Sequence, residues 1–182
     1  MEVKMKLEFS IEEEDYINFN MHYLDNSKKL KQSMYIFRFI LPIIISFLIV
    51  YIISKIVRHH IIVLVIAYFL IYFIWIYFFE KSVDESTRKR IKKVLSEGKN
   101  KGLLGKRTFE INDNYIKDSN KYRTQIVNIN ALEKIFITDE YVFFYISSIS
   151  AFIVPLRIFE SNEEKEEFKN YVNSIKKSLQ CE

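Results

Sequence analysis

The sequence is poor in the residues that build compact chemical sites. Its 182 residues include one cysteine, three histidines, three glycines and two prolines. The single cysteine, Cys181, excludes an internal disulfide framework and a thiolate metal cluster within one chain. The histidines His22, His59 and His60 leave little material for a metal site or a general base.

Motifs for catalysis and phosphate binding are also missing. The chain contains no HExxH, GxxxxGK[ST], GxSxG or CxxC pattern. Gly98, Gly102 and Gly105 lie between a basic helix and a strand, which is not the strand-then-helix context of a phosphate-binding loop. We interpret these glycines as a hinge. The sequence predicts no enzymatic activity, no catalytic residue, no bound metal and no cofactor.

Charged residues are nearly absent from Phe39 to Phe79, although they make up 27% of the chain. The first apolar segment, residues 35–57, includes 16 uncharged residues between Arg38 and Lys55. At about 1.5 Å per residue, a helix of this length crosses a hydrocarbon core of about 30 Å. The second segment, residues 61–79, has no charge, glycine or proline over 19 residues. Both segments are predicted membrane spans.

The short connection from Lys55 to His60 predicts a hairpin with both termini on one side of the membrane. Most of the basic residues flanking the hairpin gather on that side, so the positive-inside rule predicts cytoplasmic termini. The first span begins after more than thirty residues, which does not resemble a signal peptide. Neither span has an ionisable residue near its centre, which argues against a proton relay or an ion-coupled transporter. His59 and His60 are interpreted as structural, with a proton sensor as the alternative.

The N-terminal arm alternates apolar and charged residues over positions 3–9, as a strand with one buried face does. Ser10 and Glu13 have the spacing of a capping box, which predicts a helix that continues to about Asp25. The remaining acidic residues of its first turn are Glu12, Glu14 and Asp15. They suit the positive end of the helix dipole, and a cation site is the alternative interpretation.

The most basic part of the chain follows the second span, within a helix predicted over residues 81–97. Residues 83–107 contain nine Lys or Arg and three acidic residues, a net charge of +6. Anionic lipid attracts each such base near a membrane surface by about 1 kcal/mol. Nucleic acid is the disfavoured partner, because membrane tethering and topology already account for the bases. The candidate contacts to anionic lipid are Arg88, Lys89, Arg90, Lys92 and Lys93.

From Thr108 onward the pattern changes to short alternating segments broken by turn residues. Strands are predicted at 107–111, 115–117, 122–127, 132–138, 141–146 and 151–156. Five or more short antiparallel strands at this spacing indicate a small sheet or a partly closed barrel.

The last segment is predicted to be an amphipathic helix. Ser161 and Glu164 form a second capping-box pair. Apolar residues then recur on one helical face at Phe168, Val172, Ile175 and Leu179. This face is expected to pack on the sheet, with a groove for another helix as the alternative.

Two residues before this helix carry further expectations. Pro155 cannot donate a hydrogen bond to a sheet, so its strand is expected to end there or to lie at an edge. Arg157 is expected to form an ion pair with Glu160 and Glu163, and a phosphate headgroup is the alternative partner.

Three short segments stand out in the C-terminal part of the chain: Gly105-Lys-Arg-Thr-Phe109, Leu132-Glu-Lys-Ile135 and Ile153-Val-Pro-Leu-Arg-Ile-Phe159. With these segments and the order of its elements, the chain resembles the YcxB-like family of small bacterial membrane proteins. The aromatic residue expected ahead of Leu132 is replaced by Asn128 to Asn130. The resemblance implies a pleckstrin-homology-like C-terminal domain joined to a two-span hairpin, and it implies no reaction.

The sequence therefore predicts an α+β membrane protein in the bacterial cell membrane. Residues 1–34 form an N-terminal strand and helix, 35–80 a transmembrane hairpin, 81–105 a basic helix and glycine hinge, and 106–182 the pleckstrin-homology-like domain, a small antiparallel sheet or barrel closed by a C-terminal helix. Its partners are the lipid bilayer and a protein, or a second copy of the chain. The expected function is a cytoplasmic module that binds protein or lipid. The alternative is a protective factor against membrane-active peptides, or an accessory subunit of an exporter.

Overall fold

The structure is a computed structural model that describes residues 4–56, 61–97, 100 and 102–180. The chain divides into two compact units. One unit combines Met1–Asn20 with Lys92–Glu182, and the other is Met21–Ile91. Residues 57–60, with His59 and His60, lie outside the described residues, as do Gly98 and Cys181.

The first unit contains a four-stranded antiparallel sheet in the order β1-β2-β3-β4. Its strands are β1 (Met5–Ile11), β2 (Gly105–Ile111), β3 (Tyr115–Asn120) and β4 (Thr124–Asn128). The predicted N-terminal strand is confirmed, and it pairs with β2, with Met5 opposite Ile111 and Ile11 opposite Gly105. The sequence does not predict this pairing, because alternation identifies a strand and its buried face but not its neighbour.

The remaining strands form a second antiparallel sheet in the order β5-β6-β7. These strands are β5 (Lys134–Ile137), β6 (Tyr141–Ser147) and β7 (Ser150–Pro155). The predicted antiparallel strands are confirmed, and the described strands form two sheets with no closed ring of pairs. The expectation for Pro155 is confirmed, because it is the last residue of β7, an edge strand.

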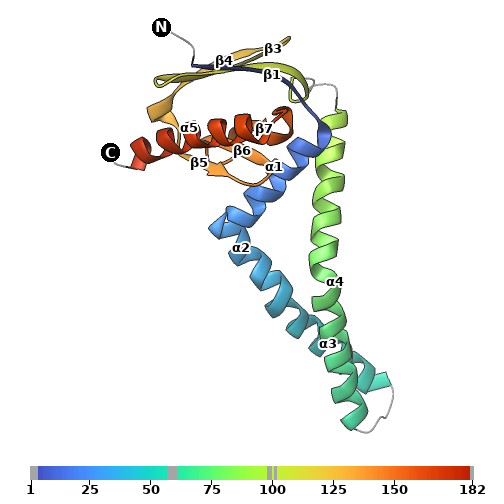
Figure 1. Cartoon of the computed structure of the whole chain (residues 1–182). Helices are drawn as coiled ribbons and strands as arrows, with labels where there is room; N and C mark the ends of the chain where they lie inside the picture. Colours follow the sequence, from blue (N-terminus) through green and yellow to red (C-terminus); the bar gives the residue numbers. More distant parts are fainter. Residues whose placement is uncertain (1–3, 57–60, 98–99, 101, 181–182) are drawn as a thin grey trace. The chain divides into compact units, whose positions relative to one another are not determined.

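Helix α5 (Asn162–Gln180) supplies one side of the core in this unit, as its predicted stripe requires (Figure 1). Phe168 and Val172 are fully buried, and Ile175 is 5% exposed. They belong to the same cluster as Phe109 and Phe144 of the two sheets. The cap is confirmed as well, because the backbone N–H of Glu164 donates to the Ser161 hydroxyl at 3.1 Å.

The start of helix α1 (Glu13–Asn26) differs from the predicted capping box. Ser10 lies within β1, so it cannot cap the helix. Instead the backbone N–H of Glu12 donates to a carboxylate oxygen of Asp15 at 2.7 Å. A carboxylate in the first turn therefore accepts a hydrogen bond from the backbone just before the helix. This is one of the two hydrogen bonds of a capping box, formed two residues later in the chain than predicted.

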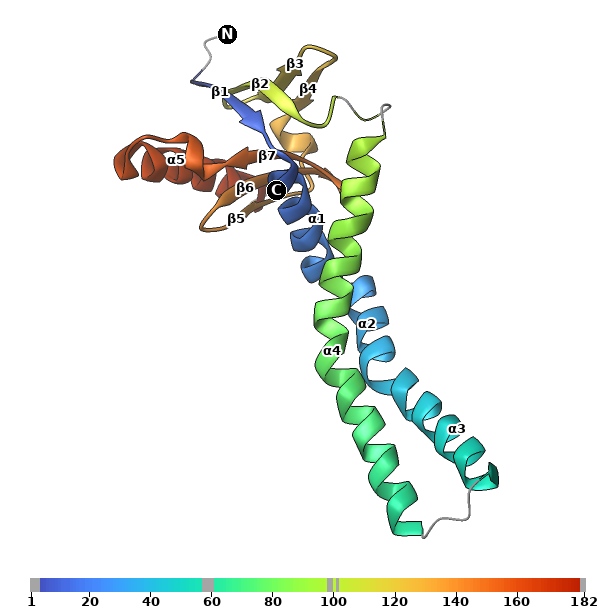
Figure 2. The same ribbon diagram turned by 90° about the vertical axis from the view of Figure 1, so that its right-hand side faces the viewer.

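The second unit is helical. After α1 come α2 (Lys28–Tyr35), the π-helix η1 (Ile36–Ile40) and α3 (Leu41–Ile56), followed by α4 (Ile61–Ser96) (Figure 2). The residues of α4 from Lys92 onward belong to the first unit. The stretches Lys28–Lys55 and Ile61–Ser96 are long and apolar enough to cross a membrane, each with a mean hydropathy of 2.7 in its most apolar window. The second apolar run and the basic segment are one continuous helix, as the sequence suggests.

Candidate functional site

The five basic residues predicted to contact lipid all lie on α4, but they are not equivalent. Arg88 is half-buried, and its Nε donates to Asp84 at 3.3 Å. Lys92 forms an ion pair with Glu13 at 3.1 Å. The other three, Lys89, Arg90 and Lys93, are exposed, and no described carboxylate lies within ion-pair distance of them.

Helical geometry explains this division. At about 100° per residue, Lys89, Arg90 and Lys93 share an arc of about 100° on α4. Ile91 lies on the opposite side of the helix and is 8% exposed. We call the three exposed bases the basic face. Along the helix axis the basic face lies about 15–21 Å beyond Phe79, the last residue of the apolar run.

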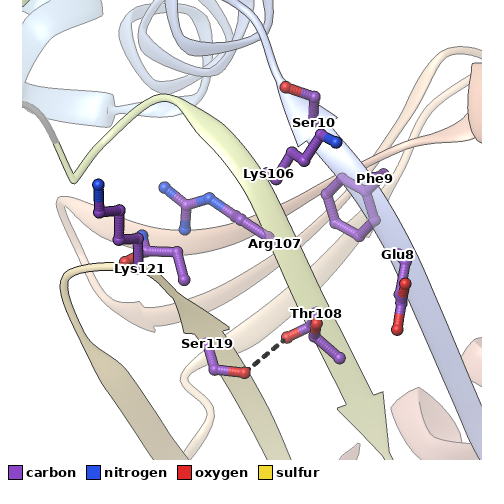
Figure 3. A pocket seen from close by; sticks show the side chains of 9 residues that line it. Glu8, Phe9, Ser10, Lys106, Arg107, Thr108, Ser119 and Lys121 are labelled. Atoms are coloured by element: carbon purple, nitrogen blue, oxygen red, sulfur yellow. Dashed lines mark hydrogen bonds between the residues drawn. The ribbon is translucent and has the colours of Figure 1, made fainter.

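A second positively charged surface lies on the four-stranded sheet, and the sequence analysis does not predict it. The outer sides of β1, β2 and β3 form a shallow trough of about 600 Å³ (Figure 3). Lys106 lies opposite Ser10 in the β1–β2 pairing, and Ser119 lies opposite Thr108. Lys121 also lines the trough. The arrangement depends on the long-range pairing of β1 with β2, so no local sequence pattern contains it.

Charge in the trough favours an anion. Lys106 and Lys121 are exposed, and Glu8 is the one acidic residue that lines it. The hydroxyl groups of Ser10 and Ser119 add polar atoms, of which Ser119 already donates to the Thr108 carbonyl at 3.4 Å. The site is open to solvent along the sheet, so it provides charge and hydrogen bonds without enclosing a ligand.

Arg107, at the edge of the trough, has a structural role. Its side chain is 10% exposed and forms an ion pair at 2.7 Å with Asp118, which is 3% exposed. The same guanidinium donates to the carbonyl groups of Gly102 and Leu103. Gly105 follows with a φ of 96°, a conformation that favours glycine. Arg107 thus fixes the path of the chain into β2, and Asp118 neutralises its charge.

The acidic residues that begin α1 hold the two ends of the sequence together. Asp15 is 1% exposed and accepts hydrogen bonds from both terminal nitrogens of Arg157, with Nη2 at 2.7 Å. Glu12 lies 3.5 Å from the same guanidinium. The expected pairing of Arg157 with Glu160 and Glu163 is therefore wrong. The partners of Arg157 lie in the first turn of α1 and just before it, more than 140 residues earlier in the chain.

Two further polar groups complete this cluster, which we call the Asp15 clamp. The hydroxyl of Tyr141 donates to Asp15 at 3.1 Å, and Asn18 donates to that hydroxyl at 3.0 Å. Burial raises the pKa of Tyr141, and the hydrogen bond that Arg157 donates to Asp15 raises the pKa of Arg157. Both groups therefore stay protonated as donors near neutral pH. The clamp joins α1, β6 and the segment after β7.

No described part of the chain brings together three histidine, cysteine, aspartate or glutamate side chains that could hold a metal ion. Asp15, the best buried acid, is already occupied by Arg157 and Tyr141. The cation-site interpretation of the acids at the start of α1 therefore finds no support. The basic face and the trough both present exposed basic side chains, and both suit binding of anionic groups.

Comparison with known proteins gives one positive result. Residues 111–172 match the family model described as YcxB-like protein. No curated protein and no solved structure matches the chain. The matched region runs from the end of β2 into α5, so it covers most of the two sheets and the first half of the C-terminal helix. The resemblance to the YcxB-like family that the sequence suggests is thus confirmed over residues 111–172.

Proposed function

We propose that the chain is a non-enzymatic integral membrane protein, in which a two-helix anchor presents a pleckstrin-homology-like module that binds anionic groups in the cytoplasm. The observation that carries the proposal is the composition of α4. One uninterrupted helix is apolar for 19 residues and then displays the basic face. A membrane anchor and a charged binding surface thus share a single rigid element.

The exposure of the apolar helices supports lipid as their surroundings. Ile61 is 76% exposed and Tyr77 is 79% exposed, and none of the most apolar window of α4 is buried inside the protein. Each exposed Å² of apolar surface costs about 25 cal/mol in water. Patches of this extent are typical of membrane or protein contact sites rather than of free surfaces.

The strand and helix order supports the pleckstrin-homology-like part of the proposal. Four antiparallel strands, then three, then one amphipathic helix packed on the core agree with the small β-domain that the family resemblance implies. The positive-inside rule then assigns this module and both termini to the cytoplasmic side of a bacterial membrane. The alternative, a protective factor or exporter subunit, gains no support from any contact of the described residues.

Distance decides how the basic face can act. Its residues lie about 15–21 Å beyond the apolar run, whereas the headgroup layer is about 5–8 Å thick on each side. Salt screens charges over about 8 Å under physiological conditions. Contact with lipid therefore requires α4 to incline toward the membrane, and otherwise the basic face is available to an acidic protein. The trough lysines, Lys106 and Lys121, offer the same module a second anionic contact.

A fluorescent reporter on α4 tests the lipid contact. A polarity-sensitive dye is attached to Ser96→Cys in a Cys181→Ser background, and the full chain is placed in nanodiscs. Adding phosphatidylglycerol to phosphatidylcholine is expected to shift the emission toward that of a headgroup environment, and salt should reverse the shift. Reversal to Glu at Lys89, Arg90 and Lys93 should abolish it, because up to about 3 kcal/mol of attraction is removed.

The matched control reverses three bases outside the basic face and outside the trough, namely Arg123, Lys176 and Lys177. It changes the net charge equally and should leave the shift in place. Equal loss in both triple variants would show that only net charge matters. If the emission does not change when phosphatidylglycerol is added, lipid is not the ligand of the basic face.

A further inference from the structure

A cavity of about 520 Å³ lies within the helical unit, between the end of α1, α2, η1 and α4. Much of its lining is apolar: Met21, Leu24, Met34, Phe39, Phe79 and Val83. Its volume falls in the range of small-molecule sites, about 300–1,000 Å³. The cavity is formed by residues of one compact unit, so it does not depend on how the two units are placed.

If the proposed membrane anchor is correct, this cavity lies at the level of the lipid headgroups. Phe39 and Phe79 stand at the ends of the two apolar runs. Lys31, which also lines the cavity, is about 12 Å before Phe39 along the helix, and Asp84 is about 8 Å beyond Phe79. The cavity therefore extends from the edge of the hydrocarbon core into the polar layer, as an amphipathic ligand does.

Most charged side chains that line the cavity have a partner of opposite charge in the described part of the chain, and two do not. Arg38 forms an ion pair with Glu80, and Asp84 accepts a hydrogen bond from Arg88. Asp25 and Lys31 also line the cavity, and neither has an ion-pair partner among the described residues. One uncommitted negative charge and one uncommitted positive charge thus remain at the water-facing part of the lining.

The floor of the cavity is a specialised part of the helix. The π-helix η1 contains Arg38 and Phe39, and π-helical turns occur frequently at functional sites. The indole N–H of Trp75 donates to the Phe37 carbonyl at 3.2 Å, which ties η1 to α4. The Nε of Arg38 is buried and has no acceptor among the described residues.

We propose that this cavity binds one phospholipid with a zwitterionic headgroup and a primary ammonium, as in phosphatidylethanolamine. Lys31 and the Arg38 guanidinium face the phosphate and ester oxygens, and Asp25 accepts hydrogen bonds from the ammonium. The apolar lining contacts the first methylene groups of the acyl chains. An anionic lipid would leave Asp25 beside a negative headgroup, which disfavours it.

Trp75 provides a direct probe, because it is the single tryptophan of the chain and lies next to the cavity floor. The full chain is reconstituted in phosphatidylcholine bilayers that contain a small share of lipid brominated near the headgroup end of its acyl chains. Bromine quenches tryptophan at short range. Brominated phosphatidylethanolamine is expected to quench Trp75 more strongly than its share of the lipid predicts, with a relative binding constant about two- to fivefold above that of brominated phosphatidylglycerol.

Two substitutions and their controls locate the selectivity. Lys31→Gln and Asp25→Asn are each expected to bring the ratio close to one. Lys29→Gln, on the same helix but not in the lining, and Glu85→Gln, beside Asp84, should leave it unchanged. These positions are exposed, so the substitutions are expected to leave folding unaffected.

The outcomes separate this site from the proposed anchor. If the quenching of Trp75 is proportional to the fraction of brominated lipid in every variant, the cavity does not select a lipid. That result would contradict the proposed site and would leave the proposed membrane anchor unaffected. A preference for phosphatidylglycerol would overturn the zwitterionic assignment. If bilayers made entirely of brominated phosphatidylcholine fail to quench Trp75, the chain is not inserted and both proposals are lost.

Discussion

Replacing Phe168 with alanine is expected to destabilise the sheet-containing unit by about 3–5 kcal/mol, the largest effect of any single substitution considered. The ring is fully buried and packs against Phe159 with a centroid separation of 5.1 Å. It belongs to the core cluster that both sheets share. Truncation to Cβ leaves a cavity at the point where α5 joins the sheets, and rigid strands cannot collapse to fill it.

Thermal unfolding of the full chain in detergent, followed by near-ultraviolet circular dichroism, measures this effect. The control is Asn170→Ala, two residues later on the exposed side of α5, which should change stability by less than about 0.5 kcal/mol. An equally small effect at Phe168 would mean that α5 does not form part of the core. Phe168→Leu should recover much of the loss, since it restores apolar volume.

Asp15→Ala is expected to destabilise the same unit by about 2–3 kcal/mol. The substitution removes the acceptor for Arg157, for the Tyr141 hydroxyl and for the Glu12 backbone N–H. Tyr141 is 8% exposed, so its hydroxyl would be left largely without a water partner. An unsatisfied buried donor costs about 1–3 kcal/mol. Arg157 adds less, because its half-exposed guanidinium can regain water.

The matched control for Asp15 is Glu163→Ala, which removes the acid that sequence proximity assigns to Arg157. Glu163 is exposed on the first turn of α5, so its loss should change stability by less than about 0.5 kcal/mol. A double-mutant cycle with Arg157→Ala should give a clear coupling energy for Asp15 and none for Glu163. The reverse result would contradict the Asp15 clamp.

The contrast between Glu163 and Asp15 shows what local sequence reasoning can supply. The spacing of Phe168, Val172 and Ile175 predicts a helix and its buried face correctly, because both depend on residues within a few turns. The partner of Arg157 depends instead on where α1 and β1 pack. Ion pairing follows spatial proximity, and the nearest acids in sequence are not the nearest in the fold.

The candidate binding surfaces also depend on contacts between residues far apart in the sequence. A count of basic residues predicts that positive charge follows the second apolar run, and the structure agrees. The count does not predict that, among the described residues, Lys92 is ion-paired whereas Lys89 is not, because the pairing of Lys92 with Glu13 arises from tertiary contact. The trough around Lys106 requires β1 beside β2, and the cavity around Lys31 requires α1, α2, η1 and α4. Neither surface has a motif that a linear pattern could contain.

The proposed function requires that the two apolar helices cross a membrane with both ends of the chain inside the cell, and cysteine labelling tests this directly. Three single-cysteine forms of the full chain are compared: native Cys181, Ser27→Cys, and His59→Cys, the latter two in a Cys181→Ser background. In intact cells a membrane-impermeant maleimide should label position 59 only, and positions 27 and 181 should react after the membrane is permeabilised. Labelling of position 181 in intact cells, or recovery of the full chain in a detergent-free soluble fraction, would contradict the account.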